Sequence, residues 1–429
     1  MKSTPLYLTL LFITVSSAQA DWKFSGSAGP YVNALNFPST TVSPSLKTGL
    51  STELKLDNKI NNSWRVKSEF FFRNDFLARD SVETLQWNPK NLYIQKKSNS
   101  LVFRLGFQTL SIDGPDIINP ADVVHSKNFV DPTNPITYSS AGLSVSQEIE
   151  KWNWEVFYIP LQTPPVLPGA HSPWLPRKNR LPVESNNLEF RIPDNVRYQY
   201  QKPKELDHAL KNNVSVKVQR KSENLEAQVV LYDGLSQSPF ILAEVDSTLI
   251  SASPKYTVLA NSPVKLRPLY YRQQVAAGTF VIPLSSWAIR GGMNWTKPYK
   301  DERVPGETIT AVMGLEKNIE TSIGMITMIG QYIRQQRQVE TQISFLRSFF
   351  QEALSFGARV PWGEETSFFL GGIYDQRGYS SIYKLGGTHR ITNSWSIEAG
   401  AQYLQGPKKT LIGLYDRYDT YLARAIYSW

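Results

Sequence analysis

Apolar and polar residues alternate along most of this chain. In residues 64–73 every second position is aromatic or aliphatic and the positions between them carry charge, and residues 101–108, 287–295 and 394–403 repeat the pattern. Successive side chains of a β-strand point to opposite faces, so each segment predicts a strand with one apolar and one polar face.

About 18 such strands follow one another, among them 90–97 and 268–283, and a count of 16 to 18 fits the pattern. Short polar turns alternate with longer connections, of which the longest are 75–89, 111–138, 161–212 and 234–267. Outer-membrane barrels have an even number of antiparallel strands, short turns at one end and longer loops at the other. The predicted fold is therefore all-β, a transmembrane antiparallel β-barrel with long outer loops and both termini at the end with the short turns.

A soluble β-sandwich also alternates, so other features must separate the two classes. Tryptophans such as Trp64, Trp152, Trp287 and Trp395 fall near the ends of predicted strands, as in the aromatic girdles of membrane barrels. No apolar run is long enough for a membrane helix. A chain of this kind can enter a bilayer only as a closed barrel, because lipid offers backbone groups no hydrogen bonds.

The first residues indicate export. Lys2, an apolar core at 6–15 and an Ala18-Gln19-Ala20 cleavage site make residues 1–20 a predicted signal peptide. Residues 21–429 then form a single barrel domain, and the expected location is the bacterial outer membrane. The chain has no cysteine, which excludes disulfides and thiol chemistry.

The last strand carries a second indication of the same location. Its alternating residues end in Tyr427-Ser428-Trp429, which resembles the terminal strand of bacterial outer-membrane proteins. The resemblance implies that Tyr427 and Trp429 are read by the outer-membrane assembly machinery.

The polar faces of the strands are rich in positive charge. Rings of Arg or Lys in a pore favour anions, and the alternative is that these cations pair with acids on neighbouring strands. Lys217, Lys384 and Arg424 are among the inward positions, and the predicted pore-lining set is Arg65, Lys67, Arg73, Arg104, Arg290, Arg347 and Arg359.

Two loops are long enough to fold into the lumen. Residues 111–138 contain Asp113, Asp116 and Asp122 among several prolines, and residues 161–212 begin with a proline-rich stretch. Proline stiffens a segment that has no sheet pairing. We expect at least one of these loops to form a constriction or plug, with the three aspartates in the constriction, although a surface position for either loop stays open.

One stretch of about 75 residues resembles a known family. Arg104-Leu-Gly-Phe-Gln108 leads to Asn119-Pro-Ala-Asp122, and a later strand ends in Tyr158-Ile-Pro160 before a proline-rich loop. This R-x-G-x-Q … N-P-x-D pattern is similar to that of large, porin-like outer-membrane β-barrels of Gram-negative bacteria, a family mostly without established functions. Size and charge also resemble those of polysaccharide-export barrels.

Catalytic and metal chemistry find little support. His389 has serines nearby in sequence, but serine is common in barrel strands, and the spacing of Asp113, Asp116 and Asp122 fits no known calcium loop. We therefore predict no enzyme, no metal and no cofactor. The net charge of +9 indicates lumen or lipid-headgroup contacts and not nucleic acid.

Two functions remain. The first is an outer-membrane channel for passive or substrate-selective transport of small solutes, with anions favoured by the inward cations. The second is the barrel component of a polysaccharide or lipid export or trafficking system. Expected partners are outer-membrane lipids, the assembly machinery and an unidentified small solute, and the sequence leaves open a homo-oligomer.

Overall fold

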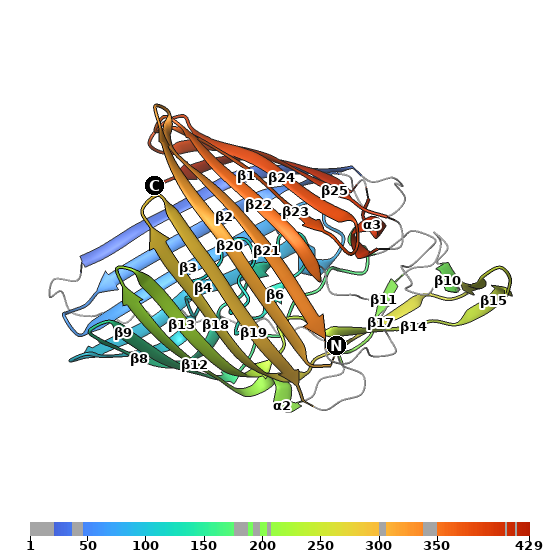
Figure 1. Ribbon diagram of the computed structural model, residues 1–429, viewed down its shortest axis with the longest axis horizontal. Helices are drawn as coiled ribbons and strands as arrows, with labels where there is room; N and C mark the ends of the chain where they lie inside the picture. The colour runs from blue at the N-terminus through green and yellow to red at the C-terminus, as the bar shows by residue number, and fades with distance from the viewer. Residues whose placement is uncertain are drawn as a thin grey trace.

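Eighteen antiparallel strands close into one barrel in the computed structural model, which describes residues 21–36, 46–175, 188–191, 198–203, 207–299, 306–337, 350–407, 410–416 and 418–429 (Figure 1). The predicted all-β barrel is confirmed, with 18 strands. In chain order they are β1 (Asp21–Asn36), β2 (Leu46–Lys59), β3 (Trp64–Asp75), β4 (Leu85–Ser98), β5 (Leu101–Gln108), β8 (Ser140–Ile149), β9 (Trp152–Leu161), β12 (Lys211–Ser222), β13 (Leu225–Leu235), β18 (Arg272–Leu284), β19 (Trp287–Pro298), β20 (Thr308–Thr321), β21 (Gly324–Arg337), β22 (Glu352–Trp362), β23 (Thr366–Asp375), β24 (Ser380–Arg390), β25 (Trp395–Gln405) and β26 (Asp419–Ser428).

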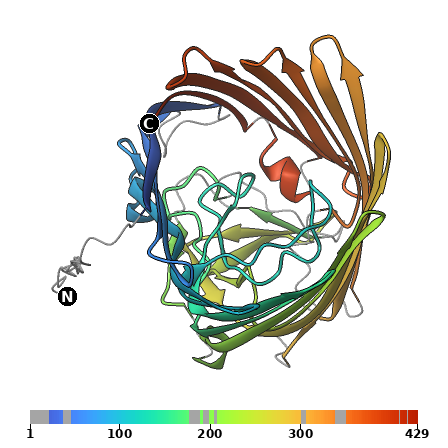
Figure 2. The same cartoon turned by 90° about the vertical axis from the view of Figure 1, so that its left-hand side faces the viewer.

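Each barrel strand pairs with the next one along the chain, and the ring closes where β26 meets β1 (Figure 2). At this seam the backbones of Gly26 and Trp429 exchange two hydrogen bonds of 3.2 and 3.1 Å. Trp429 also packs on Phe24 and Tyr427, with ring centroids 6.4 and 5.9 Å apart. The predicted final strand therefore completes the cylinder and leaves no free edge.

The connections differ between the two ends of the barrel. The start of β1, the end of β26 and most short turns, such as 60–63, 150–151 and 391–394, lie at one end, which we call the turn end; one short turn, 376–379, lies at the opposite end. The long connections, including 109–139, 162–210 and 236–271, lie at the other, the loop end. This is the arrangement expected of an outer-membrane barrel.

The outer face of the barrel is apolar and has aromatic residues at both rims. Tryptophans gather at the turn end, where Trp152, Trp362 and Trp395 are 51%, 62% and 46% exposed. Exposed tyrosines follow the loop end, namely Tyr158, Tyr332, Tyr374, Tyr383, Tyr403 and Tyr421. Amphipathic rings favour the two interfaces of a bilayer, so this surface faces lipid.

Some strand boundaries differ from the sequence-based ones. The strand expected at 268–283 begins only at Arg272, because Tyr270 and Tyr271 turn into buried clusters at the loop end. The strand expected from residue 90 begins at Leu85 and accommodates Pro89 at an irregularity in its pairing with β3. The signal peptide predicted at 1–20 lies outside the described residues.

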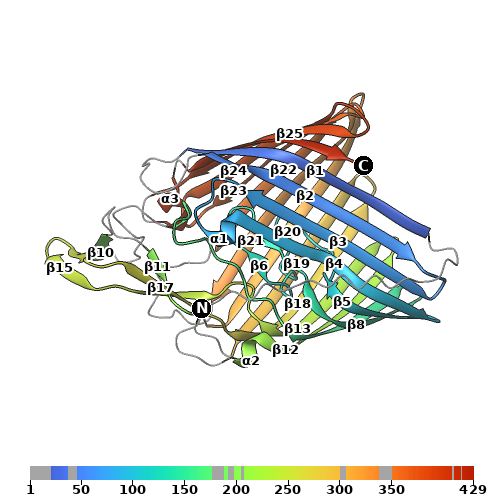
Figure 3. The same ribbon diagram turned by 180° about the vertical axis from the view of Figure 1, so that it is seen from behind.

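The long outer loops contain strands that the sequence analysis missed. Strands β14 (Phe240–Glu244), β15 (Ser247–Ser251), β16 (Tyr256–Ala260) and β17 (Val264–Leu269) form two small sheets with β10 (Leu188–Arg191) and β11 (Tyr198–Tyr200), which extend beyond the loop end in Figures 1 and 3. They were missed because their core, built around Leu175, Val264 and Leu266, joins segments far apart in sequence.

The remaining elements are short. Strands β6 (Lys127–Asn128) and β7 (Ile136–Thr137) pair with each other, and the helices are α1 (Ser81–Thr84), α2 (Asp207–Leu210) and α3 (Leu411–Leu414). Among the described residues no helix is long and apolar enough to cross a membrane.

Closure of the ring depends on a small residue at the seam. A Cβ atom on Gly29 would lie 1.7 Å from the carbonyl oxygen of Ala425, so Gly29→Ala must push β1 away from β26. Such overpacking costs about 1–3 kcal/mol. We expect a lower urea midpoint for the transition between the compact and the unfolded form of the barrel on unboiled gels.

Gly330→Ala is the matched control, because a Cβ atom at Gly330 on β21 meets nothing within 4 Å. Equal midpoints for the two variants would show that the seam does not limit the stability of the barrel.

Candidate functional site

Residues 109–139, which connect β5 to β8 and which we call the inner loop, fold back into the lumen. Figure 2, a view along the barrel from the turn end, shows segments of the chain inside the ring of strands. The inner loop contacts the inner face of β12, β13, β18, β19, β21, β24 and β25 through side chains described below. It therefore touches opposite walls of the barrel.

One side of the inner loop is held by an apolar core inside the barrel. Leu110, Ala121, Val123 and Val124 pack on inward side chains of β9, β13 and β18, namely Phe157, Ile159, Val230, Tyr232, Val275 and Ala277. All of these are at most 7% exposed. Burying a side chain of this size contributes about 1.5–3 kcal/mol, so the cluster fixes the loop against this wall.

Apolar residues on both faces of β13 are the sequence signal for this contact. On β13, Val229 and Leu231 are about half exposed on the lipid face, whereas their neighbours Val230 and Tyr232 are buried on the lumen face. A strand that is apolar on both faces must be covered on both. In a wet lumen this pattern indicates where an inserted segment packs.

Asp113 fastens the start of the inner loop to the same wall. Its carboxylate accepts a hydrogen bond from Gln219 at 2.5 Å and lies 3.2 Å from the Lys221 ammonium. Its backbone carbonyl accepts from Thr279 at 2.7 Å and from Gln228. Partial burial by itself would raise the pKa of Asp113, but Lys221 and Gln219 outweigh it and hold that pKa below its usual value. Asp113 is thus a charged anchor at neutral pH.

Asp116 joins a second ionic group on the neighbouring strands. Arg290 of β19 lies 2.7 Å from Glu316 of β20 and 3.4 Å from Asp116, and it donates a hydrogen bond to the Gly114 carbonyl. Burial, with a smaller contribution from Glu316, raises the pKa of Asp116 above its usual value. One guanidinium therefore serves two carboxylates and the loop backbone.

Asp122 has a different environment, within the loop itself. It forms an ion pair with Lys127 at 2.9 Å, and it closes a turn in which Asn119 Oδ1 accepts from the Ala121 amide. Asn294 of β19 donates to the Pro120 carbonyl at 2.7 Å, which ties this turn to the wall. The Asn-Pro-x-Asp motif is thus a structural turn. The three aspartates face separate partners, and within the described ranges no three acidic or histidine side chains converge on one point.

His125 is the fully buried polar residue of the inner loop. Its Nε2 accepts a hydrogen bond from the Leu110 amide at 2.7 Å, so its Nδ1, 3.1 Å from Ser140 Oγ, carries the proton. Burial lowers the pKa of His125 to about 4. A second proton on Nε2 would face the Leu110 N–H, so the loop position requires the neutral ring.

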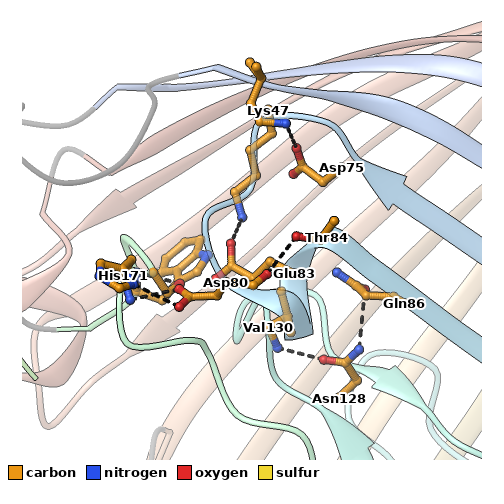
Figure 4. A network of polar contacts seen from close by, with 12 residues as sticks. Lys47, Asp75, Asp80, Glu83, Thr84, Gln86, Asn128, Val130 and His171 are labelled. Carbon is orange, nitrogen blue, oxygen red and sulfur yellow. Dashed lines mark hydrogen bonds and ion pairs between the residues drawn. The ribbon is translucent and has the colours of Figure 1, made fainter. Parts of the chain in front are cut away.

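Other loops lock together at the loop-end rim, as Figure 4 shows. Lys47 and Glu83 form an ion pair of 2.7 Å with both side chains almost fully buried. Asp80, which precedes α1, accepts from the His171 backbone amide at 2.8 Å and lies 3.0 Å from His171 Nδ1. These contacts bind the 162–175 segment to α1, and Trp174 at its end is 3% exposed among Tyr415 and Tyr418.

The predicted pore-lining cations differ in their partners. Arg65 pairs with Asp57, Lys67 lies 3.7 Å from Glu69, and Arg104 lies 3.2 Å from Glu155. Glu155 also binds Lys217 at 3.3 Å, and Arg290 belongs to the group described above. Pairing across neighbouring strands, the alternative raised from the sequence, accounts for Arg65 and Arg290. Lys67 pairs within β3, and Arg104 pairs with an acid of β9, two strands away.

Two of the predicted cations have no such partner. Arg73 stacks on the Tyr31 ring, 4.3 Å from its centroid, and Arg359 projects from β22 with high exposure. Within the part of the chain that the structure describes, neither forms an ion pair. Arg347 lies outside the described residues.

Described residues line two cavities that lie beside the inner loop, away from its apolar anchor. The larger, of about 1050 Å³, lies between Asp116–Ile118 and strands β19–β25. Its lining extends from Ile412 and Tyr415 at the loop end to Thr327 and Arg359 near the turn end. The smaller, of about 350 Å³, lies beside β1–β4 and β24–β26, and Arg73 and Glu398 are among its lining residues.

Most of the lining of the larger cavity is apolar, with charge in only a few places. Ile118, Phe350 and Ile373 form one apolar side, and Phe369 projects inward from β23 with 45% of its surface exposed. Arg359 and Lys384 supply positive charge beside it. The cavity therefore suits a solute that has both an apolar and a polar part.

No protein-family profile and no curated protein matches this sequence. Among solved structures, Acinetobacter baumannii OccAB3 is similar with a TM-score of 0.53 and 9% identity, covering 95% of this chain and 99% of that one. Acinetobacter baumannii OccAB1 gives 0.52 and 8%, with 96% of both chains covered, and Pseudomonas aeruginosa OpdQ gives 0.50 and 8%, with 96% and 97% covered.

At such low identity the similarity concerns the fold alone. Together with the closed ring, the apolar outer face and the aromatic rims, it defines the class of this protein, an outer-membrane-type β-barrel of 18 strands. The R-x-G-x-Q … N-P-x-D pattern is not confirmed as a family marker, although its Asn119, Pro120 and Asp122 form the turn that Asn294 ties to the wall.

The buried neutral His125 predicts that acid loosens the inner loop. The pKa of His125 in the folded protein, about 4, lies below the usual 6.5. The contribution of His125 to stability is therefore complete above pH 6.5 and is lost as the pH falls towards 4. The loss amounts to about 3 kcal/mol. Proteolysis of the inner loop in detergent-solubilised barrel should accelerate across this range.

In the variant His125→Gln the rate of proteolysis of the inner loop should depend much less on pH, since glutamine cannot gain a proton. His389→Gln, at an exposed site on β24, is the control and should retain the wild-type profile. A wild-type loop that is equally resistant at pH 7.5 and 4.5 would contradict the account.

Proposed function

We propose that this protein is an outer-membrane channel for small solutes. The observation that supports it best is the larger cavity, whose lining extends most of the way from the loop end to the turn end of a closed barrel. Barrels of 16–18 strands leave an aqueous lumen unless it is plugged. Here the inner loop narrows the lumen, with its base packed on β9, β13 and β18, and the larger cavity leaves a passage beside β19–β25.

The charge of the lining favours anions. In the larger cavity Asp116 and Glu316 both contact Arg290, whereas Arg359 and Lys384 have no carboxylate partner among the described residues. Arg73 faces the smaller cavity, whose lining also includes Asp75, Asp131 and Glu398. Unpaired cations in a narrow lumen attract anions and repel cations. In this proposal Arg73 and Arg359 act as pore-lining residues, and Arg65, Lys67, Arg104 and Arg290 mainly hold the wall and the loop. Asp113, Asp116 and Asp122 then keep the constriction in place and leave contact with the solute to the cations.

We further propose that the protein is exported by the 1–20 segment and inserted by the outer-membrane assembly machinery through Tyr427 and Trp429. Both side chains project outward at the turn end, 40% and 42% exposed, where a second protein can reach them. They lie beside Trp395, whose ring centroid is 5.1 Å from that of Tyr427.

A channel of this kind should give discrete conductance steps in planar bilayers. Arg359→Glu, which places a negative charge in the larger cavity, should move the reversal potential in a salt gradient towards cation preference. Lys317→Glu is the control, because Lys317 lies over the Trp287 ring outside the lumen and changes the net charge equally.

If the wild-type protein gives no conductance in the bilayer, the proposed channel function is wrong. Equal reversal potentials for the two variants would refute the anion preference while leaving the channel intact.

Insertion in cells and refolding in detergent distinguish the proposed recognition role of Trp429 from a role in the stability of the barrel. Trp429→Ala should lower the amount of folded barrel inserted in cells severalfold, yet refold in detergent nearly as well as wild type. Trp395→Ala removes an aromatic ring from the same cluster away from the C-terminus and serves as control. If both variants insert alike, Trp429 is not a recognition residue.

A further inference from the structure

The tip of the inner loop, residues 131–135, reaches the wall opposite the apolar anchor. Lys384 of β24 donates hydrogen bonds from Nζ to the Thr133 carbonyl, at 2.7 Å, and to Asn134 Oδ1. Gln402 of β25 donates from Nε2 to Thr133 Oγ1 at 2.8 Å. Two side chains from adjacent strands thus hold one loop residue and its neighbour.

The tip has its shape without help from the wall. Asp131 Oδ1 accepts from the backbone amide of Thr133 at 3.0 Å and from its hydroxyl at 2.6 Å, and the Asn134 amide donates to the Asp131 carbonyl. Prolines 132 and 135 flank this turn and limit its backbone freedom. The contacts with Lys384 and Gln402 therefore set the position of the tip and not its conformation.

The two lumen cavities meet at this contact. The residues that line both are Asn134, Trp174, Phe369 and Lys384. Two of these four, Asn134 and Lys384, are bonded to each other across the lumen. The bridge from the tip to β24 therefore lies on the boundary between a space of about 1050 Å³ and one of about 350 Å³.

We propose that Lys384, with Gln402, is the residue that sets the size limit of the channel, by holding the loop tip as a strut that divides the lumen. The inference rests on the proposed channel function. Lys384 suits this role because its ammonium, on a strand that forms the wall, is bonded only to neutral oxygens of the loop in the described structure. Its removal takes away both bonds without leaving a buried carboxylate unpaired.

Lys384→Met tests the strut in planar bilayers, with polyethylene glycols of increasing size added to find the largest that still enters the pore. We expect both the exclusion size and the conductance to increase, because the two cavities would then form one continuous space. Lys55→Met is the matched control. It removes the same charge from the lumen face of β2, where Lys55 lies 3.8 Å from Glu53 and does not touch the loop.

The outcomes separate the two proposals. If the wild-type protein never conducts, the proposed channel function is wrong. If the wild-type protein conducts but Lys384→Met and Lys55→Met exclude the same polymers, the channel stands and the proposed role of Lys384 is wrong. A smaller exclusion size in Lys384→Met would also contradict that role.

A second variant covers the case in which Lys384→Met folds poorly. The chain has no cysteine, so Asn134→Cys with Lys384→Cys can be joined specifically by a short, cleavable bifunctional thiol reagent. The joined protein should show the wild-type exclusion size, and cleavage of the link in the same membrane should enlarge it. If cleavage of the link leaves the exclusion size unchanged, the proposal is wrong.

Gln402→Met, which removes one of the hydrogen bonds, should give an intermediate exclusion size. A wild-type exclusion size in this variant would count against a role for Gln402.

Discussion

Every feature of this protein depends on one constraint, which is that a backbone in lipid must satisfy its hydrogen bonds internally. A sheet meets that requirement only when it has no edge. Here the requirement is met where β26 pairs with β1, through Gly26 and Trp429 at the turn end and through the close approach that Gly29 permits. Once the ring is closed, alternation along each strand assigns apolar side chains to lipid and polar ones to the lumen.

A closed ring of this size has a lumen wider than its own side chains can fill, and the chain uses its inner loop to occupy it. The loop is not placed symmetrically. Apolar packing against β9, β13 and β18 and the bonds of Asp113 fix one side of it. Among the described residues, hydrogen bonds from Lys384 and Gln402 hold its tip on the far wall. A strongly anchored base and a lightly held tip leave open space along one wall, and this asymmetry is what makes a narrow passage compatible with a stable loop.

The electrostatics of the lumen follow from the same asymmetry. Where the loop meets the wall, charges are shared among several partners, as Arg290 is shared by Glu316, Asp116 and the Gly114 carbonyl. Partly buried charges need such partners, because desolvation is costly. Where the loop leaves the wall, water can solvate a charge, and Arg359 lines the cavity without a carboxylate partner in the described part of the chain. Burial thus separates the cations that hold the structure from those available to a solute.

The sequence by itself determined the class of fold. Period-two alternation, the spacing of turns and the placement of tryptophan are local properties, and they predicted an 18-stranded barrel with long loops at one end. Local pattern also placed Arg73, Arg104 and Arg359 on the polar face of their strands, because side-chain direction in a strand depends only on position. The sequence could not say which of these cations is paired, since the partners of Arg104 and Arg290 come from other strands or from the loop. Nor could it show that residues 109–139 enter the lumen, that β14–β17 form sheets above it, or that Lys384 meets Thr133. Those contacts join residues far apart in the chain, and only closure of the ring brings them within reach of one another.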